Sequence, residues 1–260
     1  MTGARWQRLD RAAAGFVEDF TGPRLDPGRW VEHYLPHWTT PERSRARYDL
    51  LADGPAGPGG LRLRVDADQP GWRPEDAPLR VSSLQTALFS GPAGSTRGTH
   101  RHRPDGLVVR TPTPLRLLWA PRAGQVDVTV TAGRDDGCTL AVWLVGTEHL
   151  DERDSGEVCL FEIDGEAVAD SATTARTGVK AHHDPRLVTD VREVVVPVGA
   201  GTAHTWSARW DGGGVVVACE DEVVLTSPQV LRYPLQLVVS LFAVRPGARG
   251  SALVHEVVAT

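Results

Sequence analysis

The runs LAVWLVG (140–146) and SGEVCLFEIDGE (155–166) follow one another in the middle of the chain. The first is continuously apolar and of strand length, which is typical of a strand covered on both faces. The second gathers three glutamates and one aspartate within ten residues, interleaved with apolar side chains. Carboxylates at strand spacing raise one another's pKa, so such a group is either solvated or used for chemistry. We therefore expect a covered strand followed by a strand with an acidic face.

The rest of the chain shows the same two-residue periodicity. In VDVTVT (126–131) valines alternate with polar side chains, the pattern of half-buried antiparallel strands. Turn signals such as RDDG (134–137) and WDGGG (210–214) separate the strand-like segments at the short spacing typical of a sandwich or barrel. The sequence therefore predicts an all-β fold, a single-domain antiparallel β-sandwich. Longer apolar runs occupy 194–198, 214–226 and 235–244.

Length and charge limit the domain count and the partners. The 260 residues fit one sandwich domain, which we place at 16–260 after a short helical or extended segment at 1–15, where residues 4–14 could form one helix. A net charge of −5 argues against nucleic acid or an anionic membrane as the main partner. The sequence lacks an apolar run of 18 residues and an apolar leader, so we expect a cytoplasmic protein without a membrane span.

Two registers are open for the acidic strand. Strict alternation places Glu162, Asp164 and Glu166 on one face. Glu157, Cys159 and Glu162 share a face only if a β-bulge follows Cys159, because their spacing is two and then three residues. The residues of the strand alone do not choose between these registers.

The acidic stretch and four others resemble segments of one enzyme family. The four are FVEDFTGPRLDPGRW (16–30), RAGQVDVTVTAG (122–133), HTWSARWDGGGVVVACEDEVV (204–224) and LQLVVSLFAV (235–244). Together they resemble the family 16 glycoside hydrolases, the laminarinase and lichenase group with a concanavalin A-like jelly roll. That family's signature is E-x-D-x-x-E in a bulged form or E-x-D-x-E in a regular form. Trp143 lies fourteen residues before Glu157, a spacing similar to the family's, which favours the bulged register.

The resemblance implies a role for each glutamate. Glu157 would be the nucleophile and Glu162 the acid/base of a retaining glycosidase, whose two carboxyl groups lie about 5–5.5 Å apart. Asp164 and Glu166 remain the alternative pair of the regular register. The chain departs from the family at Cys159, which stands where the family has an aspartate. A thiol is a weak donor and carries no charge unless its pKa falls, so we expect slower cleavage or different chemistry.

Aromatic residues and histidines supply the candidate substrate contacts. Trp38, Trp72 and Trp119 lie in proline-rich loop contexts, where indole rings could line a cleft and stack on sugars. Trp143 lies on the strand before the acidic one and could reach the same cleft. His182, in KAHHD (180–184), could assist proton transfer beside the carboxylates.

The sequence predicts no cofactor and no metal. The family's C-terminal aspartate, which often helps hold a structural calcium, is replaced here by His255, so a calcium site is not favoured. His100 and His102 lie close together in THRHR (99–103), but a metal would need further ligands. An anionic ligand or a solvated loop explains this pair more simply.

Three functions follow from these features. The first is a retaining hydrolase or transglycosylase acting on a β-linked glycan. The second is an intracellular enzyme of the same fold that performs acid/base chemistry, such as cyclisation or dehydration, on a small metabolite. The third is a carbohydrate-binding protein without turnover. The expected partner is an oligosaccharide or small molecule, and the sequence makes no prediction of oligomeric state. Glu157→Gln separates the classes, since it should abolish turnover but leave a lectin's binding largely intact.

Overall fold

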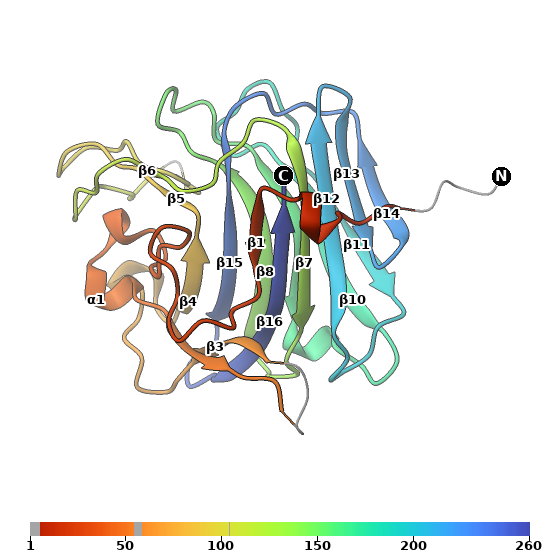
Figure 1. Ribbon diagram of the computed structural model, residues 1–260. Helices are drawn as coiled ribbons and strands as arrows, with labels where there is room; N and C mark the ends of the chain where they lie inside the picture. The colour runs from red at the N-terminus through yellow and green to blue at the C-terminus, as the bar shows by residue number, and fades with distance from the viewer. Residues whose placement is uncertain (1–5, 55–58, 104) are drawn as a thin grey trace.

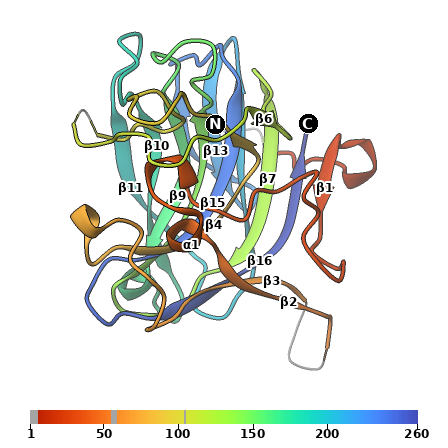
Figure 2. The same ribbon diagram turned by 90° about the vertical axis from the view of Figure 1, so that its left-hand side faces the viewer.

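The computed structural model describes residues 6–54, 59–103 and 105–260, which form two stacked antiparallel sheets (Figures 1 and 2). In Figure 2 the strands of the six-stranded sheet lie to the left, and β7, β16 and β3 of the larger sheet lie to the right. The fold class predicted from the two-residue periodicity is confirmed.

The six-stranded sheet carries the acidic strand near its middle. In spatial order its strands are β11 (Asp190–Val196), β10 (Thr173–Lys180), β9 (Glu157–Asp164), β8 (Cys138–Gly146), β15 (Leu235–Ala243) and β4 (Arg80–Gln85). The larger sheet runs β14 (Glu222–Ser227), β13 (Gly214–Cys219), β12 (His204–Asp211), β7 (Gly124–Thr131), β16 (Gly250–Ala259), β3 (Gly60–Val65) and β2 (Arg47–Leu51), with β1 (Phe16–Glu18) also paired to β16. A short ribbon joins β5 (Ala87–Leu88) and β6 (Arg116–Leu117).

Strand β8 shows how the sequence pattern builds two apolar layers. Leu140, Val142 and Leu144 belong to the main core between the sheets. The alternate residues Trp143 and Val145 belong to a second apolar cluster on the opposite face of the six-stranded sheet. A continuous apolar run therefore marks a strand that is buried on both faces, as predicted.

Loops from the first half of the chain cover that second face. They carry Tyr34, Trp38, Trp72 and Leu107, all buried against the outer side of β8 and β15. Figure 1 shows these loops, with α1, β5 and β6, gathered at one side of the sandwich. The loops leave part of the outer face uncovered around β9, which fixes the position of the site described below.

Helices are few and short in the described residues. They are η1 (Arg11–Ala13), η2 (Pro36–Trp38), α1 (Pro41–Ser44), η3 (Pro74–Asp76) and η4 (Gly165–Ala167). The helix predicted over 4–14 is reduced to the 3-10 turn η1, capped by the Asp10 side chain, while residues 4 and 5 lie outside the described residues. Backbone pairing competes with helix formation here, since the amide of Trp6 donates to the carbonyl of Asp221. None of the described helices is long and apolar enough to cross a membrane.

Candidate active site

A β-bulge in β9 places the two candidate glutamates on one face. Across β8, Cys159 lies opposite Trp143 and Phe161 lies opposite Val142, so Leu160 is the extra residue of the bulge. Leu160 and Phe161 both enter the main core, which restores the outward orientation of the next residue. The structure therefore has the bulged register, with Glu157, Cys159 and Glu162 on the outer face.

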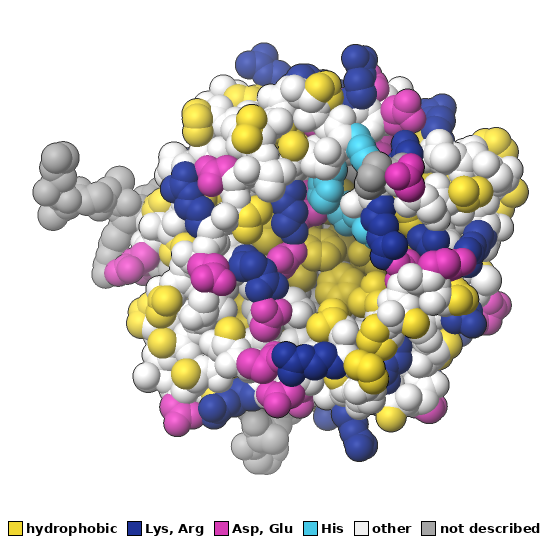
Figure 3. All heavy atoms as spheres, turned by 180° about the vertical axis from the view of Figure 1, so that it is seen from behind, with side chains coloured by type: hydrophobic (Ala, Val, Ile, Leu, Met, Phe, Trp, Pro, Cys, Tyr) yellow, Lys and Arg dark blue, Asp and Glu magenta, His cyan; other side chains and the backbone are white. Residues whose placement is uncertain are grey.

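This face forms the floor of a cavity of about 310 Å³. Tyr34, Trp143 and Phe242 supply its apolar surface. Figure 3 shows the hollow, with an apolar floor, histidines grouped along one side, and acidic and basic side chains around it. Glu157, Glu162, Arg176, Lys180, His100, His102 and His182 also line it.

Glu157 lies at the bottom of the cavity, with only 1% of its side chain exposed. Its Oε1 is 2.9 Å from the Lys180 ammonium, and its Oε2 is 2.9 Å from His182 Nε2. Burial on its own would raise the pKa of Glu157, but the charge of Lys180 and the hydrogen bond with His182 lower it to about 2. Glu157 is therefore held as a carboxylate, the form that a nucleophile needs.

Three donors converge on Glu162. Its Oε1 accepts from Lys180 Nζ at 2.5 Å and from Trp143 Nε1 at 3.1 Å. Its Oε2 accepts from Arg176 Nε at 3.1 Å. A carboxylate oxygen of Glu162, one of Glu157 and the Cys159 sulfur all lie within 4.8 Å of one another. The two carboxyl groups are thus close to one another on the outer face.

Cys159 lies between the glutamates as a neutral thiol. It is completely buried, and burial together with the charge of Glu162 raises its pKa well above the usual value. Its sulfur contacts the carbonyl oxygen of Arg176 at 3.6 Å. A thiol in this state is a poor nucleophile, so it fills the middle position without adding charge.

The neighbouring strand β10 supplies the cations that face these carboxylates. Arg176 is paired with Glu162 and Lys180 with Glu157 in the cross-strand register. Burial alone would lower the pKa of Lys180, but the adjacent carboxylates raise it above its usual value, and its ammonium lies 5.2 Å from the centre of the Trp143 ring. Lys180 is therefore a fixed positive charge that contacts both glutamates.

The loop after β10 holds His182 against Glu157. His182 adopts a left-handed backbone conformation, with φ of +47°, which is uncommon outside glycine and is often found at functional sites. Buried Asp184 anchors the loop by accepting from the Tyr233 hydroxyl at 2.7 Å. The amide of Gly156 donates to the same Tyr233 hydroxyl, so this loop and the start of β9 share one anchor.

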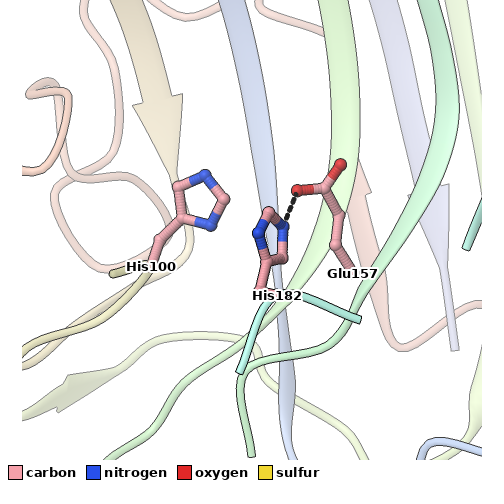
Figure 4. A group of neighbouring side chains, drawn as sticks. All are labelled: His100, Glu157 and His182. Carbon is pink, nitrogen blue, oxygen red and sulfur yellow. Dashed lines mark hydrogen bonds and ion pairs between the residues drawn. The ribbon is translucent and has the colours of Figure 1, made fainter. Parts of the chain in front are cut away.

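A second loop brings His100 to the same place (Figure 4). His100 is buried, with φ of +57°, and its backbone amide donates to Glu148 Oε1 at 2.5 Å. Figure 4 shows His182 between His100 and Glu157, and the two imidazole rings meet edge-on, with an interplanar angle of 84°. Burial lowers the pKa of His100 well below its usual value, and burial lowers that of His102 to about 4. The rings of His100 and His102 are therefore neutral near pH 7.

The structure separates the predicted tryptophan contacts. Trp143 lines the cavity, as His182 does. Trp38 and Trp72 are completely buried, so they present no ring face to a ligand. They support the cavity instead: the indole of Trp38 donates to the Thr99 carbonyl, next to His100, and that of Trp72 donates to the Tyr34 carbonyl. Trp119 packs on the main core beside Phe16 and Trp210.

The residues of the regular register lie at the margin. Asp164 shares the outer face but is bound by Arg176 at 2.6 Å and by Thr139 at 2.6 Å. Glu166 lies in η4 and forms an ion pair with Arg245. Neither lines the cavity. At the C-terminal position of the family's calcium aspartate, both ring nitrogens of His255 have protein partners, Thr131 and Gly59.

Sequence reasoning did not assign roles to Arg176 and Lys180. The signal was present, because Lys180 is the only lysine of the chain and lies four residues after Arg176 on a strand-like segment. Glu157 and Glu162 are five residues apart, but the bulge absorbs one of these residues. The two glutamates therefore lie opposite Lys180 and Arg176, which are four residues apart on the neighbouring strand. Recognising this match required the pairing of β9 with β10, which the sequence does not state.

Comparisons with known proteins give structural relatives only. No protein-family model matches the chain, and no curated protein matches it by sequence. A GlcNAcα1-4Gal-releasing endo-β-galactosidase from Clostridium perfringens aligns over 98% of this chain, with a TM-score of 0.79 and 17% identity. The chain spans 64% of the length of that enzyme.

Two further relatives match nearly their whole length. The catalytic domain of an endo-1,3-β-glucanase (laminarinase) from Thermotoga petrophila has a TM-score of 0.62 and 12% identity, covering 95% of this chain and 96% of that one. A mixed-linkage glucan enzyme of family 16 from Bacteroides ovatus, in complex with its G4G4G3G product, has a TM-score of 0.57 and 12% identity, covering 94% and 99%. The chain therefore has the jelly-roll fold of the family 16 glycoside hydrolases, as its sequence resemblance predicted.

Proposed function

We propose that this protein is a retaining glycoside hydrolase or transglycosylase that acts on a β-linked glycan, with Glu157 as nucleophile and Glu162 as acid/base. The observation that carries the proposal is the bulged strand, which brings carboxylate oxygens of the two residues within 4.8 Å at the floor of a cavity. Retaining glycosidases need such a short separation, whereas inverting enzymes hold their carboxyl groups about 6.5–9.5 Å apart.

The reaction proceeds in two displacements. The Glu157 carboxylate attacks the anomeric carbon, the glycosidic C–O bond breaks, and the proton of Glu162 passes to the leaving oxygen. Water or a sugar hydroxyl then attacks the anomeric carbon, Glu162 accepts its proton, and the bond to Glu157 breaks. The Trp143 ring at the cavity wall offers an apolar face to the sugar.

Lys180 constrains the first displacement. Its ammonium is 2.5 Å from Glu162 Oε1. The carboxyl group of Glu162 has to carry a proton before it can donate that proton to the leaving oxygen. Lys180 already has a second partner in Glu157 Oε1, at 2.9 Å. When Glu162 is protonated, Lys180 therefore turns toward Glu157 and remains paired, which keeps the nucleophile ionised throughout the step.

A hydrolysis screen tests this proposal. The glycans are a β-1,3-glucan, a mixed-linkage β-glucan and a β-galactoside-linked glycan, chosen from the substrates that the relatives' names give. Glu157→Gln and Glu162→Gln should each reduce turnover by at least about 100-fold, the scale of a general acid or base. Asp164→Asn is the matched control, because it removes a carboxylate on the same face outside the cavity, and it should retain most of the activity.

Chemical rescue distinguishes the two roles. With an activated aryl glycoside and added azide, Glu157→Ala should give a glycosyl azide of inverted configuration, because azide takes the place of the nucleophile. Glu162→Ala should give a product of retained configuration, because azide attacks the intermediate on Glu157. The opposite pattern would reverse the assignment.

A carbohydrate-binding role without turnover is the second candidate. The specific observation in its favour is that both carboxylate oxygens of Glu162 already accept hydrogen bonds, from Lys180, Trp143 and Arg176. A general acid has to carry a proton on one of these oxygens. This candidate predicts no hydrolysis of any glycan and binding that Glu157→Gln leaves largely unchanged. Calorimetric titration with the glycans of the screen measures that binding directly.

A further inference from the structure

We propose that His100, His182 and Glu157 form a binding site for a divalent first-row transition metal ion such as Zn²⁺. One ring nitrogen of each histidine and one carboxylate oxygen of Glu157 all lie within 4.8 Å of one another. Two imidazoles and one carboxylate are a ligand set that zinc and similar ions accept, with a further position left for water or substrate.

The three ligands come from separate segments of the chain. Glu157 begins β9, His182 lies in the loop after β10, and His100 lies in the covering loop that Glu148 anchors. The sequence offered only His100 and His102 as a pair without further ligands. The fold instead groups His100 with His182 and Glu157, and Figure 4 shows the His182 ring between the other two side chains.

His100 provides an independent observation. Its Nδ1 is buried and has no hydrogen-bond partner, although the residue is only 6% exposed. A buried polar nitrogen without a partner is costly, so such an atom is expected to have a ligand that is bound under some condition. Metal coordination would satisfy this nitrogen.

The distances require only modest movement. His182 Nε2 and Glu157 Oε2 are 2.9 Å apart, whereas two ligands on a tetrahedral zinc with bonds of about 2.0–2.1 Å are separated by roughly 3.3 Å. The His100 nitrogen would approach by up to about 1.5 Å to reach the same separation. Lys180 contacts the other oxygen of Glu157, so the metal would replace only the hydrogen bond between Oε2 and His182 Nε2, whose proton would be released.

Metal binding would compete with the proposed glycosidase, since both use Glu157. The binding itself does not depend on that function, and it is measured without any glycan. The test uses the full chain without an affinity tag, stripped with a chelator and titrated with Zn²⁺ against a chromogenic competitor at pH 7. We expect the protein to take one equivalent of Zn²⁺ from the dye.

Variants identify the ligands. His100→Gln and His182→Gln should each weaken Zn²⁺ binding by at least about 10-fold, while His33→Gln, a half-buried histidine outside the cavity, should leave it unchanged. Unchanged affinity in both ligand variants, with melting curves that show them folded, would overturn the proposal.

A second measurement covers the case in which the variants do not fold. Co²⁺ titration of the unmodified chain should give visible d–d absorption that saturates at one equivalent and disappears on addition of Zn²⁺. No saturable absorption would contradict the site.

Discussion

Lys180 is the cation that contacts both glutamates of the cavity. The buried thiol of Cys159 lies between the two glutamates, and a lysine on the next strand contacts both of them. The pair is therefore organised by a cation rather than by a third carboxylate. The charge of this ammonium lowers the pKa of Glu157 against the effect of burial.

Replacing Lys180 should shift the pH dependence of turnover. Lys180 is the main group that lowers the pKa of Glu157 against the effect of burial. In Lys180→Met burial acts unopposed by that charge, the pKa of Glu157 rises, and the acid limb of the kcat/KM profile moves to higher pH. The profile of each protein on the best glycan of the screen measures this shift.

Arg192→Met is the control for that experiment. Arg192 is an exposed cation on β11 that pairs with Asp190, away from the cavity, and its loss should leave the profile in place. A Lys180→Met profile that coincides with the unmodified one would show that Lys180 does not tune Glu157.

Cys159 should be replaceable without loss of chemistry. The thiol is buried and its pKa is raised, so it carries no charge to lose. Cys159→Ser replaces the thiol by a smaller, neutral hydroxyl, and we expect kcat/KM to remain within about threefold, a change of less than about 1 kcal/mol in the activation free energy, because no charge is lost. A loss of 100-fold or more in a folded protein would assign the thiol a direct role.

At the scale of the element, the bulge at Leu160 makes the site. It sends two successive apolar residues, Leu160 and Phe161, into the core and returns Glu162 to the face of Glu157. Without an extra residue, the alternation of a strand would send one of the two glutamates into the core. The bulge thus reconciles a five-residue spacing with a single acidic face.

Deleting Leu160 should leave a folded and active protein. The remaining sequence, Glu-Val-Cys-Phe-Glu, alternates strictly, so both glutamates stay outside and the aromatic ring stays inside. We expect a loss of about 2–4 kcal/mol in the free energy of unfolding from the missing buried leucine, with turnover reduced but measurable. Urea denaturation and the hydrolysis assay measure the two effects.

Deleting Ile163 is the matched control. It also removes one buried aliphatic residue, but it moves Asp164 into the inward position and buries a carboxylate in the apolar core. This variant should not fold. If the two deletions behaved alike, the register argument would be wrong.

The sequence predicted the strands and the acidic face more successfully than the walls of the cavity. Period-two patterns specify which residues of a strand share a face, but they left two registers open. The bulged register was favoured by the fourteen-residue spacing between Trp143 and Glu157, which is similar to that of the resembled family. Loop tryptophans such as Trp38 carry no such pattern. They are buried because a second apolar layer forms outside the sheet, a property of tertiary packing that no local signal encodes.

At the scale of the whole molecule, the covering loops are attached to the sandwich by buried polar contacts. Glu148 is the clearest case, because it is only 3% exposed and accepts from the backbone amides of His100 and Arg101. Burial raises the pKa of Glu148 to about 8. Ionising it in the folded protein therefore costs stability at alkaline pH.

The contribution of Glu148 to the free energy of unfolding should fall between about pH 6.5 and pH 8. In this range Glu148 keeps its proton in the folded protein and has lost it in the unfolded chain, so the folded state binds more protons and loses stability as pH rises. The slope is at most about 1.4 kcal/mol per pH unit, which gives a decrease of about 1–2 kcal/mol. Histidines with lowered pKa, such as His102, act in the opposite direction at the lower end of this range, because in the unfolded chain their pKa is about 6.5 and they still bind protons there. Urea denaturation at several pH values measures the decrease.

Glu148→Gln isolates this contribution. The amide oxygen can still accept from the two backbone amides, but it does not titrate. The histidines titrate alike in both proteins, so the stability of the unmodified protein relative to the variant should fall by about 1–2 kcal/mol over this range. A difference that stays constant with pH would show that Glu148 does not titrate in this way.

The measurement that tests the central claim most directly is covalent trapping of the nucleophile. An activated 2-deoxy-2-fluoro glycoside of the sugar that the screen identifies should accumulate as a glycosyl-enzyme, because the fluorine slows both displacements and the activated leaving group restores the rate of the first one only. Peptide mass spectrometry should then place one sugar on Glu157, and Glu157→Gln should remain unlabelled. A label on Glu162 or any other residue, or turnover of the natural glycan with no covalent species, would contradict the assignment of Glu157 as the nucleophile.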